Sequence, residues 1–347
     1  MTADEAPFLV LNAGSSSLKF AIFDRGSSPK LRLKDEVSGY GEEAENAMLA
    51  RLDAAGIDLR KVSAVGHRIV HGGGDFTAPV IVTDQIFAAL EKLTVLAPLH
   101  QPYGLGALKR MQALVPGIPQ IACFDTAFHA SQPEIAIRLP LPQEFHDKGI
   151  RRYGFHGLNY EHVCEALPRL TGKPLPQRLI IAHLGNGASM CAVKDGKSIA
   201  TTMGYSTLDG LIMGTRTGAI DPGVTFALLR EGMTVDEVEN LFYRKSGLQG
   251  LSGFTSNMRK LLESTEPKAK FAVDAFCYWA ARQAGSLAVA LDGLDAIAFS
   301  GGIGENAPMI REQIVRRLSW IGPFTVHFLP ADEESVIARQ MFRILDQ

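Results

Sequence analysis

Two short turns rich in glycine, asparagine and serine have the composition of an anion-binding loop. One runs from Asn12 through Ser15 to Ser17, with Lys19 just beyond it, and the other is His183–Gly187. Backbone N–H groups and small hydroxyls that converge in such a turn form a concave site for a phosphate. A polar turn of this kind is more often only a turn. Because one lies in each half of the chain, however, the pair favours two loops that grip one polyphosphate.

A third glycine turn, Gly302–Asn306, lies between a predicted strand and a predicted helix and fits a dinucleotide-binding fingerprint. A Rossmann unit carries a second strand that ends in an acidic residue about 20 residues further on. The segment Trp320–Val326 stands there instead, and it contains no acid. Neither of the first two turns matches the P-loop pattern. We therefore expect the third turn to hold the adenosine part of ATP at a helix N-terminus.

Two charged residues follow predicted strands of the first half. Arg68 stands at a strand end beside Gly72–Gly74, where its planar fork can bind a carboxylate or a phosphate through two hydrogen bonds. A structural pair with a carboxylate is the alternative. Asp125 ends another strand, at the edge where ligands bind in open α/β sheets. The alternative for Asp125 is a helix N-cap.

His156 and Arg216 both stand among glycines further along the chain. His156 follows a cluster of cations and aromatic residues, and Arg216 lies on a glycine-flanked loop suited to an arginine-finger role. A structural histidine and a surface arginine are the alternatives. Phosphate-binding turns, cations for the equatorial oxygens and a carboxylate near the nucleophile are together the parts that phosphoryl transfer requires.

The elements that must position these residues alternate between strands and helices. Strands are expected at 8–11, 18–23, 31–37, 62–65, 120–124, 178–184, 190–193, 198–202 and 295–299. Helices are expected at 42–55, 84–96, 105–114, 267–291 and 307–318, and the proline-containing segment 133–149 is expected to be irregular. Each half begins with a strand, a polar turn and a second strand. This repetition predicts two duplicated α/β domains with a cleft between them.

The composition sets bounds on the class of protein. A chain of 347 residues with 46% hydrophobic and 21% charged residues has the size and balance of a two-domain globular protein. A net charge of −2 argues against a nucleic-acid partner. The apolar runs are strand-sized, and the acidic N-terminus lacks a signal-peptide core. The four cysteines are widely spaced, which predicts reduced thiols and a cytoplasmic protein.

Taken together, the motifs closely resemble the acetate kinase family. The resemblance rests on the segments 12–20, 66–73, 97–102, 124–129, 152–157, 183–187, 213–216, 302–306 and 330–334. They occur in family order across about residues 8–340. The resemblance implies the fold of the sugar kinase, Hsp70 and actin superfamily, with two domains of RNase H type, and a homodimer. It also implies ATP as phosphoryl donor and acetate as acceptor.

The resemblance assigns roles residue by residue. The metal, Mg²⁺ or Mn²⁺, is expected at Asn12 and Glu333, and the acyl carboxylate at Arg68. Asp125, His156 and Arg216 are the expected catalytic residues, and Val70, Leu99, Phe155 and Thr207 the acyl pocket. The nucleotide is expected to contact Ser15, Lys19, His183, Leu184, Gly185, Asn186, Gly187, Asn257, Met258, Arg259, Gly302, Ile303, Gly304, Glu305 and Asn306.

Three departures from the family pattern bear on function. The chain is shorter than the usual length of about 400 residues, which implies losses after the first hairpin and before the last motif. Asn257 stands where the family usually has aspartate, and Thr207 where it usually has proline. One methylene in a pocket is worth only about 1–3 kcal/mol, so the choice between acetate and propionate stays open.

The expected domains are residues 1–148 with the tail 330–347, for the acyl substrate and metal, and residues 149–329, for the nucleotide and dimerisation. The expected reaction is direct, in-line attack of the acid on the γ-phosphorus of ATP. Asp125 is not an obligatory base, because the carboxylate is already ionised. A propionate kinase is one alternative and a sugar kinase another, although Val70, Leu99 and Phe155 are poor sugar ligands. A non-enzymatic ATP-binding protein of the actin and Hsp70 type is the third.

Overall fold

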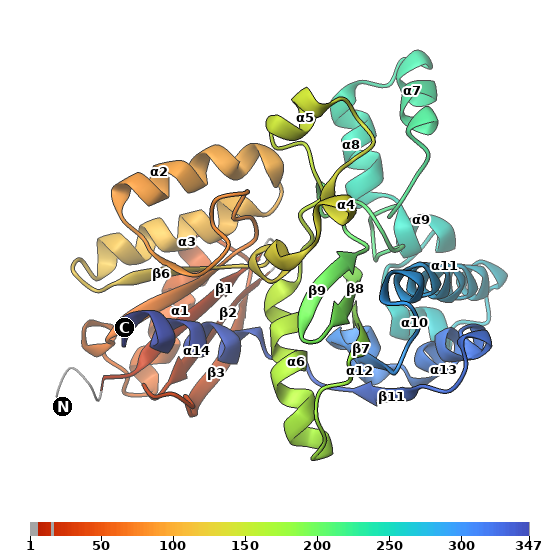
Figure 1. The fold of residues 1–347 in the computed structure, drawn as a ribbon. Coiled ribbons are helices and arrows are strands. Elements are labelled where there is room, and N and C mark those ends of the chain that lie inside the picture. Colours follow the sequence, from red (N-terminus) through yellow and green to blue (C-terminus); the bar gives the residue numbers. More distant parts are fainter. Residues whose placement is uncertain (1–5, 15–16, 347) are drawn as a thin grey trace. The chain divides into compact units, whose positions relative to one another are not determined.

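The computed structural model of the protein describes residues 6–14 and 17–346. The chain divides into two compact units, each an α/β sheet with its own helices (Figure 1). The first unit runs to Ala130 and takes up the chain again from Asp332 onwards, and the second comprises Ser131–Ala331. In the part of the chain that is described, no helix combines the length and the apolar character that a membrane crossing needs.

The first unit contains a six-stranded mixed sheet with the order β3-β2-β1-β4-β6-β5. Its strands are β1 (Phe8–Ala13), β2 (Ser17–Phe23), β3 (Leu31–Ser38), β4 (Ala64–Ile69), β5 (Val80–Ile81) and β6 (Gln120–Phe124). Its helices are α1 (Glu42–Ala54), α2 (Asp84–Lys92), α3 (Gln101–Leu114) and α14 (Glu333–Leu345). The strands β1, β4 and β6 run parallel, whereas β2, β3 and β5 are antiparallel to their neighbours.

The two faces of β4 pack against different helices, because successive side chains of a strand point to opposite faces. Val65 belongs to a buried cluster with Met111 of α3 and with residues of α1. Gly66 faces α14 instead, where a Cβ atom would lie 2.4 Å from the sulfur of Met341. The absence of a side chain at position 66 therefore lets the C-terminal helix lie directly on the sheet. Arg68, two residues further on, points to the same face as α14.

The second unit contains a five-stranded sheet with the order β11-β10-β7-β8-β9. Its strands are β7 (Arg178–Leu184), β8 (Ala188–Lys194), β9 (Lys197–Thr201), β10 (Ala296–Ser300) and β11 (Thr325–Phe328). The long helix α11 (Pro267–Leu291) and α6 (Gly157–Thr171) pack against this sheet (Figure 1). The other helices are α4 (Glu134–Ile137), α5 (Gln143–Asp147), α7 (Pro222–Arg230), α8 (Val235–Arg244), α9 (Gly247–Ser252), α10 (Met258–Glu263), α12 (Gly301–Asn306) and α13 (Pro308–Arg317).

The two sheets share a topology, as the repeated openings of the sequence predict. In each, three antiparallel strands follow one another along the chain, and the next strand pairs in parallel with the first of them. Two α/β domains of this kind were expected, and the fold class is confirmed. The sheet of the second unit adds β11, which runs parallel to β10.

Several predicted segments differ in detail from the structure. The segment 133–149, expected to be irregular, contains the short helices α4 and α5. It also groups with the second unit, which begins at Ser131 rather than at residue 149. Hydrogen bonds to strand β9 explain why this segment belongs to the second unit. The Ser131 hydroxyl donates to the Ser198 carbonyl at 2.9 Å, and the Gln132 amide donates to the Ser198 hydroxyl at 3.2 Å. The third glycine turn, Gly302–Asn306, is not a loop: it makes up most of helix α12, which runs from Gly301 to Asn306.

A buried histidine in β4 ties the stability of the first unit to pH. His67 is 1% exposed, and its Nε2 donates to Gln120 Oε1 at 2.8 Å. The Gln120 amide nitrogen in turn donates to the Ile118 carbonyl, so the glutamine oxygen faces the histidine. Burial lowers the pKa of His67 to about 4, although the bond to Gln120 opposes this shift. The folded protein therefore keeps His67 neutral.

This arrangement predicts a loss of stability in mild acid. Between pH 6.5 and about 4 the unfolded chain binds a proton at His67 that the folded chain does not, so folding weakens as pH falls. One proton corresponds to about 1.4 kcal/mol per pH unit. Urea unfolding measured across this range checks the slope, which we expect to be shallower in His67→Gln. An equal slope in both proteins would contradict a neutral, buried His67.

Candidate active site

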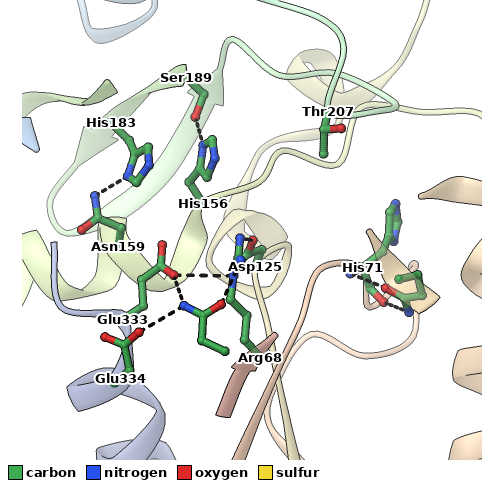
Figure 2. Close-up of polar contacts among 12 residues, drawn as sticks. Arg68, His71, Asp125, His156, Asn159, His183, Ser189, Thr207, Glu333 and Glu334 are labelled. Atoms are coloured by element: carbon green, nitrogen blue, oxygen red, sulfur yellow. Dashed lines mark hydrogen bonds and ion pairs between the residues drawn. The ribbon is translucent and has the colours of Figure 1, made fainter. Parts of the chain in front are cut away.

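In the first unit, Arg68 lies at the centre of a hydrogen-bonded cluster (Figure 2). Its Nε and Nη2 atoms donate to the two carboxylate oxygens of Asp125, at 3.1 and 2.5 Å. Its Nη1 donates to Asn12 Oδ1 at 3.1 Å. The Asn12 amide nitrogen donates onward to Glu333 at 3.0 Å and to Glu334 at 3.2 Å. The expected metal residues and the expected acid-binding arginine thus belong to one network.

The fold explains why residues so distant in sequence meet. Asn12 and Arg68 lie near the carboxyl ends of β1 and β4, and Asp125 follows β6 directly. Because these three strands are parallel, their carboxyl ends share one edge of the sheet, where open α/β proteins bind ligands. Glu333 begins α14, which lies against the same strands.

The electrostatics of this cluster favour a permanent cation at Arg68. Burial alone would lower the pKa of Arg68, but the carboxylates of Asp125 and Glu333 raise it above its ordinary value. The Asp125 side chain is 1% exposed, so its charge needs the paired guanidinium. Glu334 pairs with Lys34, whose ammonium lies 2.8 Å from a carboxylate oxygen. Burial lowers the pKa of Lys34 and the pairing with Glu334 raises it, with a net rise.

A second set of hydrogen bonds, between His71, Gln101 and Gly73, holds the turn that follows β4. The backbone N–H of His71 donates to Gln101 Oε1 at 3.0 Å, and the Gln101 amide donates back to the His71 carbonyl. His71 Nδ1 accepts from the Gly73 N–H at 2.8 Å, and burial lowers the pKa of His71 to about 4. Val70, which directly precedes His71 in the chain, is buried. Leu99, also expected in the acyl pocket, is half-buried in the turn before α3.

The donor set of this cluster fits a magnesium ion. Mg²⁺ in proteins takes oxygen ligands, commonly one or two carboxylates together with substrate phosphates. Asn12 and Glu333 offer an amide and a carboxylate oxygen of this kind, and they lie in hydrogen-bond contact. Among residues 6–14 and 17–346, no group of three or more His, Cys, Asp or Glu side chains is arranged to hold a metal. Most ligands of a bound ion would therefore come from the substrate and water.

In the second unit, His156 and His183 stack face to face. Their ring centroids are 4.2 Å apart and the planes differ by 16°. His156 Nδ1 lies 2.7 Å from the Ser189 hydroxyl, which also contacts the Tyr160 hydroxyl. Figure 2 shows that His183 is held in the same way from its Nδ1 side, by Asn159 at 2.9 Å. Each ring is therefore fixed through Nδ1.

The opposite edge of each ring faces the glycine turn between β7 and β8. A Cβ atom on Gly187 would lie 3.3 Å from His156 Nε2, and one on Gly185 would lie 3.9 Å from His183 Nε2. The Gly185 N–H donates to the Gly187 carbonyl at 3.0 Å, which closes the turn. A turn without side chains beside two ring nitrogens is a suitable place for a phosphate.

Arg216 lies beside the same turn. Its Nη1 atom is 3.9 Å from the Cβ position of Gly187 and donates to the Thr207 carbonyl at 3.1 Å. Thr207 is buried, as is Phe155, which directly precedes His156. The structure thus brings His156, His183 and Arg216 together at the glycine turn, as the sequence predicts for a phosphate site.

A cavity of about 740 Å³ opens from this turn. The predicted nucleotide residues that line it are Gly185, Asn186, Asn257, Met258, Arg259, Gly302, Ile303 and Asn306. Ala307, the last residue of the fingerprint that begins at Gly302, also lines it. Leu262 and Glu263 line it too, and no motif in the sequence marked them. Asn257 caps helix α10 by accepting from the Lys260 N–H at 3.2 Å, so asparagine fills the capping role that an aspartate would.

Some predicted nucleotide residues have other positions. Gly304 and Glu305 do not line the cavity. Their carbonyls accept hydrogen bonds from Arg311, and the Glu305 carboxylate accepts from the Ala331 N–H. Leu184 is buried in β7. In the first unit, Lys19 is exposed on β2, where it pairs in register with Asn12, and Ser15 lies outside the described residues.

Two α/β units with repeated openings give the protein the fold of the sugar kinase and actin type. A glycine turn beside a large cavity and an arginine paired with a buried carboxylate are features that suit a phosphotransferase of that type. The model of the acetokinase family matches residues 34–339. Acetate kinase from Rhodopseudomonas palustris is 42% identical over 97% of this chain and 98% of its own length. The chain belongs to the acetokinase family and is a kinase.

Solved structures agree with this assignment. A crystal structure of acetate kinase from Porphyromonas gingivalis matches with a TM-score of 0.87 and 32% identity, over 98% of this chain and all of that one. A propionate kinase from Francisella tularensis matches with a TM-score of 0.86 and 33% identity, over 96% and 98%. The alignment to the Rhodopseudomonas relative spans 390 positions, so the relative carries segments that this chain of 347 residues lacks.

The geometry around Asn186 yields a test of the phosphate site. A Cβ atom on Gly214 would lie 1.9 Å from Asn186 Oδ1, and the Gly214 N–H donates to the Asn186 carbonyl at 2.9 Å. Gly214→Ala must therefore displace Asn186 from the cavity wall. We expect ADP affinity to fall about tenfold or more, the effect of roughly 1.4 kcal/mol or more, measured by isothermal titration calorimetry.

The control for this variant is Gly285→Ala on α11, where an added Cβ makes only an ordinary contact at 3.6 Å. It should leave the ADP affinity within about twofold, because changes far from a site usually leave it unperturbed. Unchanged affinity in Gly214→Ala would contradict the role of Asn186 in the site.

Proposed function

We propose that the protein is an acetate kinase, which transfers the γ-phosphoryl group of Mg-ATP to the carboxylate of acetate and releases ADP and acetyl phosphate. The observation that carries this proposal is the hydrogen bonding of Arg68, which leaves some of its N–H donors for a ligand. Three of its hydrogen bonds go to Asp125 and Asn12, and a guanidinium has five N–H donors. Two N–H groups on the terminal nitrogens are left for a ligand carboxylate. We assign Val70, a buried apolar residue two positions further along the chain, to the wall that receives the short acyl chain.

The second unit supports the donor half of the reaction. The cavity lined by Asn257–Arg259 and by residues of α12 has the volume of a site for a small organic ligand, which we assign to adenosine. The turn Gly185–Gly187 holds the phosphates, and His156 and Arg216 offset charge on the phosphoryl group during transfer.

The metal proposed for this reaction is Mg²⁺ at Asn12 and Glu333. When bound, it offsets negative charge on the phosphate oxygens and orients them. The protein's own part is to keep these two side chains oriented. Arg68 and Glu334 hold Asn12 through its Oδ1 and its amide nitrogen, and that amide nitrogen also donates to Glu333. Mn²⁺ accepts the same oxygen ligands.

The acceptor needs no general base, because a carboxylate is already ionised near neutral pH. A carboxylate oxygen attacks the γ-phosphorus, and the bond from that phosphorus to the oxygen leaving with ADP breaks. Asp125 acts by holding the Arg68 guanidinium along its Nε and Nη2 edge. Arg68 thereby presents its remaining donors in a fixed plane.

The activity is tested by trapping the acyl phosphate with hydroxylamine. Purified protein with Mg-ATP should form hydroxamate with acetate or propionate and none with glucose. A higher kcat/KM with propionate would make the protein a propionate kinase, in keeping with the similar Francisella enzyme. ATP turnover with glucose alone would contradict the proposal, and so would slow hydrolysis that ignores every acceptor.

Arg68 offers a sharper prediction. Arg68→Lys keeps the positive charge but loses the planar fork. Hydrogen bonds to charged groups are worth about 1.5–3 kcal/mol each, so we expect the KM for acetate to rise about 10- to 100-fold. The KM for ATP should change little. Arg110→Lys, at an exposed ion pair with Glu42 in the same unit, is the control. An unchanged KM for acetate in Arg68→Lys would contradict the assigned role.

We also propose a homodimer, supported by helix α7. This helix contains Val224, Phe226 and Leu228, yet none of its residues is buried. Phe226 is 56% exposed. An apolar helix gains its stability from packing, so a helix with no buried residue and an exposed Phe226 fits a contact with a second copy of the chain.

The dimer is tested by light scattering after size-exclusion chromatography. The wild-type protein should have twice the mass of the chain, and Phe226→Asp should shift the population toward monomer, because it places a charge in an apolar contact. Lys260→Asp, which puts the same charge on the exposed side of α10, is the control. A monomeric wild-type protein would contradict the dimer.

We assign the protein to the cytoplasm on the state of its cysteines. None of the four cysteines, Cys123, Cys164, Cys191 and Cys277, takes part in a disulfide, and three of them are buried. Burial raises the pKa of Cys191 to about 12, so this thiol stays protonated and unreactive. Such thiols suit a reducing compartment.

A further inference from the structure

The second unit holds a buried amide behind the stacked histidines that the phosphoryl-transfer scheme does not use. Asn159 lies in the first turn of α6 and is completely buried. Its amide nitrogen is 2.9 Å from His183 Nδ1. On its other side, the Ser300 hydroxyl, also fully buried, donates to Asn159 Oδ1 at 3.2 Å. Asn159 thus links Ser300, at the end of β10, to the ring of His183. Figure 2 shows the contact between Asn159 and His183.

This arrangement decides which nitrogen of His183 carries hydrogen. Because the Asn159 oxygen accepts from Ser300, its N–H group is the part that faces His183 Nδ1. A ring nitrogen that accepts a hydrogen bond holds no hydrogen. A neutral imidazole then carries its single hydrogen on the other nitrogen, Nε2.

The position of His183 Nε2 allows its hydrogen to be donated to a ligand at the glycine turn. It lies on the side of Gly185 in the turn between β7 and β8, 3.9 Å from where a Cβ atom would stand. A hydrogen on Nε2 makes this edge of the ring a donor to an anion, whereas the opposite tautomer would present a lone pair to it. We propose that Asn159 is a positioning residue that fixes His183 as the Nε2–H tautomer, so that His183 donates to a phosphate oxygen at Gly185–Gly187.

The tautomer is measured directly by long-range ¹H–¹⁵N NMR on the full chain labelled with ¹⁵N-histidine. The chain has nine histidines, and the signals of His183 are those that vanish in His183→Gln. We expect His183 of the wild-type protein to show an unprotonated Nδ1 and a protonated Nε2. A protonated Nδ1 with a bare Nε2 would overturn the proposal.

Two substitutions separate positioning from mere packing. In Asn159→Asp a carboxylate faces Nδ1, so Nδ1 should gain a hydrogen. The control is Asn46→Asp on the exposed face of α1. It adds the same charge and should leave the His183 signals unchanged. In Asn159→Leu the ring loses its fixed partner and its oriented bond to the phosphate. Because a hydrogen bond to a charged group is worth about 1.5–3 kcal/mol, ADP affinity should fall about tenfold or more. Adenosine affinity should stay unchanged, because adenosine carries no phosphate.

Equal losses for ADP and adenosine in Asn159→Leu would overturn the proposal, because they would make Asn159 a packing residue. If Asn159→Leu does not fold, Ser300→Ala replaces it. That variant deletes one oxygen and frees the amide to turn, so the His183 signals should move toward a mixture of both tautomers and ADP affinity should fall. Unchanged signals and affinity in Ser300→Ala would contradict the proposal equally.

The proposal rests on the proposed function only for the identity of the ligand as a nucleotide. The tautomer is read in the absence of any substrate, so it does not depend on which acid is phosphorylated. Protein that forms no acyl phosphate but shows the Nε2–H tautomer and the ADP-specific loss would refute the proposed reaction and leave the phosphate donor in place. Protein that forms acyl phosphate but shows the opposite tautomer of His183 would refute the role of Asn159 and leave the proposed reaction in place.

Discussion

A half-buried guanidinium paired with a buried carboxylate sets the organisation of the first unit. Arg68 lies at the sheet edge in hydrogen bonds with Asp125 and Asn12. Removing Arg68 would take the paired cation from the buried Asp125 carboxylate, which is expected to cost about 3–5 kcal/mol. The C-terminal helix completes the group, because Glu333 and Glu334 reach Asn12 from its first turn. Gly66 makes that approach possible by letting α14 lie directly on β4.

In the proposed reaction, the second unit directs the hydrogen-bond donors of His183 and Arg216 toward the phosphates. No side chain of the turn blocks the phosphates there. Gly185 and Gly187 keep the turn open, and the stacked histidines direct Nε2 toward it. The partners behind the rings, Ser189 and Asn159, are fully buried, so the ring positions depend on the core of the unit. In the reaction we propose, the two units divide the chemistry: Arg68 in the first unit binds the carboxylate, and the glycine turn beside the cavity in the second binds the phosphates.

Much of this was predictable from sequence because strands and glycine turns leave local patterns. The repeated strand–turn–strand openings predicted both sheets, and the glycines marked the phosphate turn. Contacts that depend on tertiary packing left no such pattern: the Lys34–Glu334 pair joins β3 to α14, and Ser300 reaches Asn159 across 141 residues. The helix α12 was expected to be a loop, because its run of glycines has low helix propensity that packing overrides.

Oxygen tracing tests most directly whether a carboxylate is the acceptor. Acetate carrying ¹⁸O in both carboxylate oxygens is incubated with Mg-ATP, and the acyl phosphate is observed by ³¹P NMR. Direct attack by the carboxylate keeps its carbon–oxygen bond, so the account predicts a phosphorus signal shifted by one bridging ¹⁸O. An unshifted phosphorus signal, or ADP formed without any acyl phosphate, would contradict it.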